Sequence, residues 1–318
     1  MRALDGMLLL DKPAGRTSNH VLQQVRKMYK AKKAGHTGSL DPAATGMLPI
    51  CFGEATKLCG YLLDAEKTYE VEGLLGIQTD TEDADGQIIS QAQVPQLSSQ
   101  AMAQIVAGFA GDSMQTPPAY SAIKQGGVRV HKLARKGVEV VLEPRPISVR
   151  SIELMAFDGN SFAMRLRVSK GTYIRSIVRD IGLKIGCGAH VTKLRRSSVA
   201  PFDDHTMVSL AQIETADTPD ALLLSVDAMV ADWQSLTLDA DSAMRFRHGA
   251  KPPLTDTLLA EINAAKAAKV NTAEGNATDV GAIGERLRIY DADKKFIGLG
   301  QIAEGRLQTV RLIGPQIQ

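Results

Sequence analysis

Two turn sequences constrain the fold of this chain more than any other feature. Residues 147–156 and 161–169 read as strands on either side of FDGN at 157–160, which predicts a hairpin. The dipeptide DG at 85–86 predicts a second tight turn, into the apolar segment QIIS. Strands joined by such short turns pair antiparallel. We therefore expect an α/β (α+β) fold with a mainly antiparallel mixed sheet rather than a doubly wound parallel sheet.

Periodicity and turn residues predict most of the other elements. One helix is predicted from a cap at Thr17 toward Gly35, and an amphipathic helix over 173–185 is predicted to end at Gly186. Further helices are predicted at 54–63, 97–109 and 128–136 and, as two short ones, within 203–230; a strand is predicted at 68–77. The glycine- and proline-containing segments 35–53 and 110–127 are predicted to be loops.

The character of the sequence changes from about residue 203, and we predict two domains with a boundary at residue 235. Residues 1–235 form the larger one, with a central cleft between two lobes and an inserted lid at about 90–140. Residues 236–318 form a small, mostly β domain with strands at 286–290, 296–302 and 307–312. Its alanine- and glycine-rich stretch, 262–283, is predicted to be a flexible insertion.

Charge is distributed unevenly, although the formal net charge is only +2. Residues 1–40, 124–150 and 165–196 are strongly basic, whereas 62–90 and 197–244 are acidic. Basic clusters attract polyanions such as RNA and gain affinity by releasing counterions. Solvated helix faces explain the same clusters equally well, so charge alone leaves an RNA partner open.

Several classes of protein are disfavoured by what the chain contains. Its three cysteines form neither a disulfide framework nor a zinc-like cluster. The apolar run at residues 7–10 is too short for a signal peptide, and no run of about 20 apolar residues predicts a membrane span. We therefore expect a cytoplasmic protein without a membrane segment or a metal.

The segment GHTGSLDPAATG at 35–46 holds the first candidate for chemistry. Its single carboxylate, Asp41, lies near His36 and directly before Pro42. Asp41 could equally cap a turn before the proline, because Asp often does so. A metal site would need further ligands, and a phosphate loop would need a GK[ST] sequence; the segment has neither.

A second segment, SKGTYIRSIVRDIG at 169–182, places Tyr173 and Arg175 at a helix start. Backbone N–H groups there favour anions, and an aromatic ring beside a cation can stack on a base. Tyr173 could instead be core packing and Arg175 a solvated charge. Tyr69, at the start of a predicted strand, could equally be an ordinary sheet aromatic.

Six segments taken together resemble one family. LLLDKPAGRTSN, GHTGSLDPAATGMLPICFGEATK, EKTYEVEGLLG, TDTEDADG, PPAYSAIK and SKGTYIRSIVRDIG with GCGAHVTKLRR follow one another from about residue 6 to 200. In this order they resemble the TruB-type family of bacterial tRNA pseudouridine-55 synthases. The resemblance implies a pseudouridine-synthase catalytic domain followed by a small C-terminal PUA-like RNA-binding domain, in which this sequence diverges.

The resemblance implies an isomerase that converts the uridine at position 55 of the tRNA T-arm loop to pseudouridine by base flipping. The reaction needs no cofactor and no metal, the partner is the T-arm stem-loop of tRNA, and the family favours a monomer. By resemblance Asp41 is the essential carboxylate. It either attacks the nucleotide or removes the C2′ proton, and the sequence leaves both routes open.

The resemblance also assigns the other site residues. Arg175 pairs with Asp41, and Tyr69 stacks on the extruded uracil and can take part in the late deprotonation at C5. His36 fills the space that the flipped nucleotide leaves. Tyr173 and Leu194 line the pocket, and Lys12 supports the Asp41 loop. Basic side chains expected to bind phosphates are Arg26, Lys27, Lys30, Lys32, Lys33, Lys124, Arg129 and Lys132.

Three other functions compete with this one. A non-catalytic RNA-binding or RNA-folding protein would use the same basic surface, but it gains nothing from a buried carboxylate. A pseudouridine synthase for another RNA site would keep the Asp41 loop. An acid hydrolase built on Asp41 and His36 would need a second base or a metal, and the sequence offers none.

Overall fold

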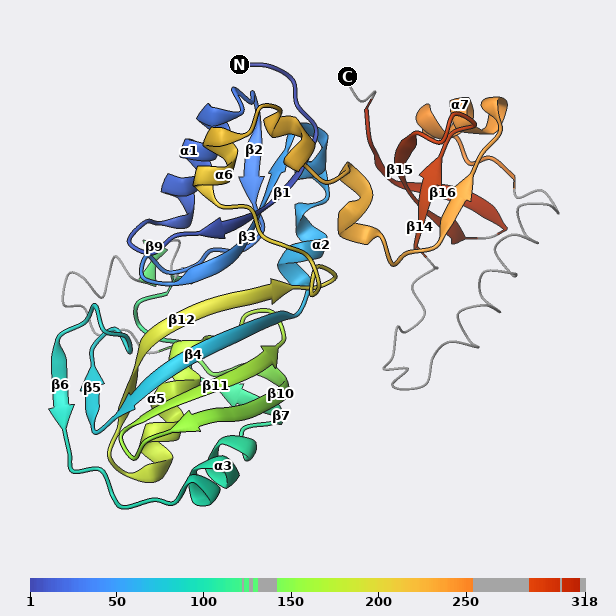
Figure 1. The fold of residues 1–318 in the computed structure, drawn as a ribbon. Helices are drawn as coiled ribbons and strands as arrows, with labels where there is room; N and C mark the ends of the chain where they lie inside the picture. Colours follow the sequence, from blue (N-terminus) through green and yellow to red (C-terminus); the bar gives the residue numbers. More distant parts are fainter. Residues whose placement is uncertain (122, 126–127, 131–141, 254–285, 304, 315–318) are drawn as a thin grey trace.

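The computed structural model describes residues 1–121, 123–125, 128–130, 142–253, 286–303 and 305–314 (Figure 1). Its main feature is an eight-stranded sheet in the order β1-β3-β12-β4-β11-β10-β7, with β2 paired to β3. Only β12 and β3 pair parallel in this sheet, which confirms the mainly antiparallel mixed sheet. The strands are β1 (Gly6–Lys12), β2 (Ala34–His36), β3 (Thr45–Phe52), β4 (Lys67–Leu75), β7 (Gly111–Gln115), β10 (Arg145–Phe157), β11 (Ser161–Val168) and β12 (Ala189–Val199).

Both turn sequences form the hairpins that they predict. β10 and β11 pair antiparallel around residues 158–160, and Asp158 accepts hydrogen bonds from the N–H groups of Asn160 and Ser161. The DG turn joins the short strands β5 (Ile77–Thr79) and β6 (Ile88–Gln91). The carboxylate of Asp80 accepts from the N–H of Gln87 and so closes this turn from the opposite side.

Helices cover the sheet in two groups (Figure 1). α1 follows the predicted cap, because the Thr17 side chain accepts from the N–H of His20, and it packs against β1 and β3. α5 packs against β4 and β12 and ends at Gly186, whose φ of 94° is left-handed. The helices are α1 (Ser18–Met28), α2 (Cys59–Asp64), α3 (Ser99–Ala107), α5 (Ile174–Ile185), α6 (Leu210–Thr215) and α7 (Ala240–Arg247), with 3-10 turns η1 (Gly53–Lys57), η2 (Pro219–Leu222) and η3 (Val226–Val230).

The C-terminal part forms a separate four-stranded sheet in the order β13-β14-β15-β16. Its strands are β13 (Ser235–Thr237), β14 (Arg286–Tyr290), β15 (Phe296–Ala303) and β16 (Arg306–Leu312), so all three predicted strands are confirmed. Phe296 and Leu299 of β15 share an apolar cluster with Met7 and Met229. The small sheet is therefore packed against the larger part of the chain, beside α2 in Figure 1.

Some local predictions are wrong. The predicted loop 35–53 contains β3, which is missed because it is buried along nearly its whole length and does not alternate. β7 and the short strand β8 (Lys124–Gln125) lie in the predicted loop 110–127. The predicted helix 128–136 begins instead with the strand β9 (Val128–Arg129), and residues 131–136 lie outside the described residues. The predicted helix 54–63 is divided between η1 and α2, and the segment 262–283 also lies outside the described residues.

Candidate active site

Lys12 fixes the loop 37–44, which joins β2 to β3 and carries Asp41. The Lys12 ammonium is fully buried and donates to the carbonyls of Pro13, Pro42 and Ala44 at 2.9, 3.1 and 2.7 Å. Burial lowers the pKa of Lys12 to about 8, while the nearby Asp41 charge raises it. Lys12 therefore holds the backbone of this loop from β1.

Two further side chains hold the same loop. The Ser18 hydroxyl, at the start of α1, accepts from the N–H of Leu40 at 2.8 Å and donates to its carbonyl at 3.1 Å. Arg196 of β12 is 1% exposed and donates to the carbonyls of Gly38 and Met47 at 3.1 and 2.7 Å. Backbone on both sides of Asp41 is thus held by buried groups, and the Asp41 side chain is left facing the cavities described below.

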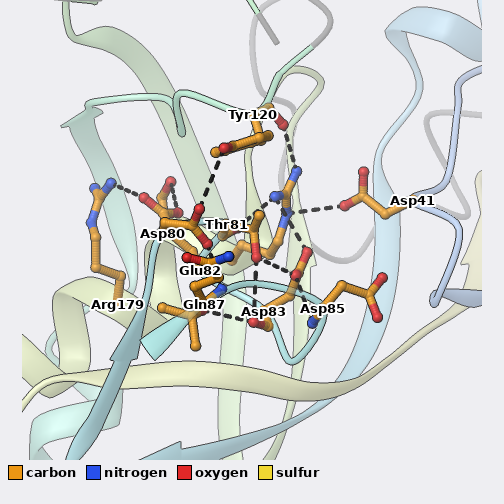
Figure 2. A network of polar contacts seen from close by, with 12 residues as sticks. Asp41, Asp80, Thr81, Glu82, Asp83, Asp85, Gln87, Tyr120 and Arg179 are labelled. Atoms are coloured by element: carbon orange, nitrogen blue, oxygen red, sulfur yellow. Dashed lines mark hydrogen bonds and ion pairs between the residues drawn. The ribbon is translucent and has the colours of Figure 1, made fainter. Parts of the chain in front are cut away.

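Asp41 and Arg175 form an ion pair, with 3.0 Å between Oδ2 and Nε. The Arg175 side chain is only 6% exposed, whereas that of Asp41 is 43% exposed. Arg175 also donates to the carbonyls of Thr81 and Tyr120 at 2.7 and 3.0 Å, and its Nη1 lies 3.4 Å from Asp83. In Figure 2, Asp41 lies on one side of this cluster, and Thr81, Asp83 and Tyr120 belong to the other.

Opposing effects set the charge of Asp41. Burial raises the pKa of the Asp41 carboxyl above its ordinary value of 3.8, and the Arg175 guanidinium lowers it. The charges of Asp83 and Asp85 raise this pKa, and Lys12 lowers it. A carboxylate with a raised pKa is a stronger base than an exposed aspartate, and a guanidinium partner keeps its charge at any physiological pH. The pair can therefore supply a carboxylate for proton removal or for nucleophilic attack.

Two cavities meet at this ion pair. The first, of about 350 Å³, is lined by Tyr69, Tyr173 and Leu194 together with Asp41 and Arg175. These five side chains come from β4, α5 and its cap, β12 and the loop 37–44, so the fold brings the sequence-predicted residues into one place. A cavity of this size and mixed lining is typical of a small-molecule site.

His36 lines the second cavity, of about 790 Å³, on the other side of Asp41. Its Nδ1 is buried and has no hydrogen-bond partner among the described residues. Burial lowers the pKa of His36, and the nearby Arg196 lowers it further, so the imidazole is neutral near pH 7. The start of α1, at Ser18 and Asn19, lines the same cavity.

The basic residues that are expected to bind phosphates differ in their exposure and in their contacts. Arg26 is half-buried and donates to the carbonyls of Ala31 and Lys32, so it holds the segment that follows α1. Lys27, Lys30, Lys32 and Lys33 are exposed along that end. Lys124 and Arg129 face each other as backbone partners in the β8–β9 pair, and Lys132 lies outside the described residues.

Sequence reasoning missed the residues that surround Arg175. Asp83 and Thr81 belong to the motif TDTEDADG, which is part of the resemblance but carried no assigned role. Gln115 at the end of β7 is 3% exposed; its amide accepts from the Tyr173 N–H at 2.8 Å and donates to the Tyr173 carbonyl at 3.0 Å. No local sequence pattern marks such a glutamine, because its side chain binds the backbone of Tyr173, which is 58 residues away in the chain.

Within the described part of the chain, no group of three or more His, Cys, Asp or Glu side chains could hold a metal ion. Over the same residues, no helix has the length and apolar character needed to cross a membrane.

Three family models match the chain in order. A TruB family pseudouridylate synthase N-terminal domain matches residues 26–174, a tRNA pseudouridylate synthase B C-terminal domain matches 175–231, and a C-terminal domain of pseudouridine synthase II TruB matches 274–313. A tRNA pseudouridine synthase B of Burkholderia mallei (strain NCTC 10247) is 41% identical over 314 residues, which is 98% of each chain. One from Nitrosococcus oceani is 42% identical over 319 residues, covering 98% of this chain and 96% of the relative.

Solved structures resemble the fold at lower identity. A Cbf5-Nop10-Gar1 complex contains a chain that matches 98% of this one and 85% of its own length, with a TM-score of 0.70 and 23% identity. An H/ACA RNP bound to a substrate RNA containing 2'-deoxyuridine contains another, with a TM-score of 0.68, 21% identity, and coverage of 98% and 86%. At these identities the likeness concerns the fold.

Proposed function

The chain belongs to the TruB family of pseudouridylate synthases and is a tRNA pseudouridine synthase, and we propose that Asp41 is its catalytic carboxylate, acting on the uridine at position 55 of the T-arm loop. Relatives named tRNA pseudouridine synthase B, 41% identical over 98% of the chain, support the activity. The assignment of Asp41 is supported by its ion pair with the buried Arg175, which lies where two cavities meet.

The reaction is an isomerisation, so no atoms are gained or lost overall. It requires one ionised carboxylate. The N1–C1′ bond of the uridine breaks, the uracil turns, and a C5–C1′ bond forms; the proton on C5 then moves to N1 through a base or the solvent. Asp41 either attacks the sugar and is released again, or it removes the C2′ proton and returns it. Both routes use an ionised carboxylate, which Arg175 favours by lowering the pKa of Asp41.

The base must leave its stack before this chemistry, because Asp41 cannot reach it inside a folded loop. We place the extruded uracil in the first cavity, where Tyr69, Tyr173 and Leu194 surround it. Tyr69 offers its ring face for stacking and is the candidate for the late deprotonation at C5. His36, as a neutral imidazole in the second cavity, takes the place of the flipped nucleotide.

The rest of the molecule serves to bind the tRNA in this proposal. Residues 1–235 form the catalytic domain, with an insert at about 90–140, and residues 236–318 form a PUA-like RNA-binding domain. Exposed lysines at the end of α1 contact T-arm phosphates, and Lys124, Arg129 and Lys132 do so from the insert. We propose that the enzyme works as a cytoplasmic monomer and needs neither a cofactor nor a metal.

The variant Asp41→Asn tests the assignment of the carboxylate. We expect it to form no pseudouridine on a T-arm stem-loop, because an amide neither attacks the sugar nor accepts the C2′ proton, while its affinity for the RNA stays within several-fold of wild type. Asp220→Asn is the matched control, because Asp220 also pairs with an arginine, Arg2, but lines neither cavity. Chemical mapping of pseudouridine after a single turnover measures the rate.

Full activity of Asp41→Asn would contradict the role of Asp41. The same mapping on bulk tRNA identifies the uridine that wild-type enzyme converts. Conversion at a position other than 55 would contradict the proposed site but not the enzyme class, and binding without any conversion would favour the non-catalytic RNA-binding alternative.

A further inference from the structure

Helix α5 carries a second arginine, Arg179, one turn after Arg175, and the proposed mechanism does not use it. The Arg179 guanidinium forms an ion pair with Glu82 and donates to the Thr116 carbonyl at 3.1 Å. Its Nε lies 2.8 Å from Asp180. The Arg179 and Glu82 side chains are only 21% and 11% exposed. Both lie outside the linings of the two cavities that the described residues form around Asp41.

The two arginines bridge the same two segments. Residues four apart in a helix lie on one face, so Arg175 and Arg179 are neighbours along α5. Arg175 reaches Thr81 in the turn 79–86 and Tyr120 in the segment 115–121. Arg179 reaches the same turn at Glu82 and the same segment at Thr116. Figure 2 shows Arg179 beside Glu82 on the side of the cluster that is farther from Asp41.

Glu82 is joined through the backbone to two residues that contact Arg175, so a shift of Glu82 moves them as well. It stands between Thr81 and Asp83, which both contact Arg175. Its φ of 63° is left-handed, which is uncommon for a residue with a side chain and needs fixing by its surroundings. That fixing comes from Arg179, from the Ser176 hydroxyl, which donates at 2.9 Å, and from backbone hydrogen bonds at both sides of Glu82.

We propose that Glu82 and Arg179 are a positioning pair, which holds the turn 79–86 and the segment 115–121 at a fixed spacing around Arg175 and so directs its guanidinium at Asp41. This inference rests on the proposed function of Asp41. Catalytic groups must be held within about 0.5 Å of their productive geometry by the residues behind them. Losing the second bridge lets the Thr81 and Tyr120 carbonyls move, and Arg175 moves with them.

Arg179→Met, Glu82→Gln and the double variant test the pair in the full-length chain. We expect each single variant to slow single-turnover pseudouridine formation on a T-arm stem-loop about tenfold, because small misplacements of catalytic groups cost one to two orders of magnitude. RNA affinity should stay within about twofold of wild type, because neither residue lines either of the two cavities at Asp41. The double variant should be no slower than the slower single one, since both changes break one bridge.

A pH profile separates positioning from simple stabilisation. If Arg175 is loosened, it lowers the pKa of Asp41 less, so the acid limb of the rate should move to higher pH in both single variants. Arg2→Met is the matched control, because Arg2 pairs with Asp220 and lines neither cavity, and this variant should leave both the rate and the acid limb of its pH profile unchanged. Arg179→Lys is a second variant for the case that Arg179→Met does not fold. The lysine keeps the positive charge facing Glu82 but lacks the planar fork of the guanidinium, so we expect a rate between those of wild type and Arg179→Met.

Wild-type rates and an unmoved acid limb in folded Arg179 and Glu82 variants would overturn the inference alone. Failure of the wild-type chain to form pseudouridine would overturn the proposed function and this inference with it.

Discussion

A single guanidinium decides the chemistry available to Asp41. Burial and the neighbouring Asp83 both raise the pKa of the carboxyl, and without compensation the acid would tend toward its neutral form. Arg175 opposes this from 3.0 Å and is itself held by the Thr81 and Tyr120 carbonyls. The result is a carboxyl group in a partly enclosed site whose pKa lies above that of a free aspartate and whose ionised form is favoured by Arg175.

The pH profile of the rate is the sharpest test of how Arg175 affects the ionisation of Asp41. The single-turnover rate should rise with pH as Asp41 ionises, with a midpoint above the ordinary value of 3.8. Arg175→Met should move this midpoint to higher pH, because Arg175 lowers the pKa of Asp41. Rates from rapid quenching, with circular dichroism at each pH to confirm folding, give the midpoints. A midpoint that stays the same or falls in Arg175→Met contradicts the electrostatic role.

Among the elements, the loop 37–44 takes its shape from three others. Lys12 reaches it from β1, Ser18 from α1 and Arg196 from β12. Gly46, at the start of β3, has a left-handed φ of 99°, and a Cβ there would lie 2.2 Å from the Arg196 carbonyl. The loop is thus a product of how β1, β3 and β12 meet, and a change in any of these contacts reaches Asp41.

Lys12→Met tests this dependence. The variant leaves the carbonyls of Pro13, Pro42 and Ala44 without their buried donor, which costs about 1–3 kcal/mol of unfolding free energy for each group that water cannot reach. We expect a lower unfolding midpoint in urea and, in addition, a slower single-turnover rate.

Arg26→Met is the control for Lys12→Met. Arg26 also donates to two backbone carbonyls but lines neither cavity, so its loss should reduce stability without slowing the reaction at saturating RNA, where a weakened phosphate contact has no effect on the rate. Equal slowing by the two variants at saturating RNA would show that the rate follows overall stability rather than the loop.

Over the whole molecule, the C-terminal sheet is joined to the larger part of the chain by specific contacts. The Arg286 guanidinium lies 5.5 and 5.7 Å from the ring centres of Tyr61 and Trp233. Arg288 pairs with Asp227 at 3.4 Å, next to the apolar cluster that both parts share. Such contacts fix the orientation of the small sheet, so an RNA that touches both parts meets them at one spacing.

Trp233→Ala tests whether this spacing matters. The change removes one of the two rings beneath Arg286 and should loosen the docking of the small sheet. We expect the Kd for full-length tRNA to rise several-fold and the Kd for the T-arm stem-loop to stay unchanged, as measured by filter binding. Equal weakening for both RNAs contradicts the proposed role of residues 236–318.

Local chemistry in the sequence was enough to predict a large share of this protein. The hairpins at 85–86 and 157–160 follow from their turn residues, and the helix that ends at Gly186 follows from its apolar period and its glycine. Neighbouring residues suffice to predict these features, because each is encoded within a short segment. Asp41 and Arg175, which the structure brings to 3.0 Å, are assigned to one pair only by the family resemblance of six segments taken together.

Only the tertiary structure decided what surrounds those residues. The buried strand β3 and the exposed edge strand β7 lack the alternation that marks a half-buried strand. Arg175 is held by the carbonyls of Thr81 and Tyr120, and every residue type carries a carbonyl, so no sequence pattern points to them. The bridge from Arg179 to Glu82 joins residues 97 positions apart. Contacts of this kind arise only when the chain has folded, because they depend on which backbone comes to lie beside a side chain.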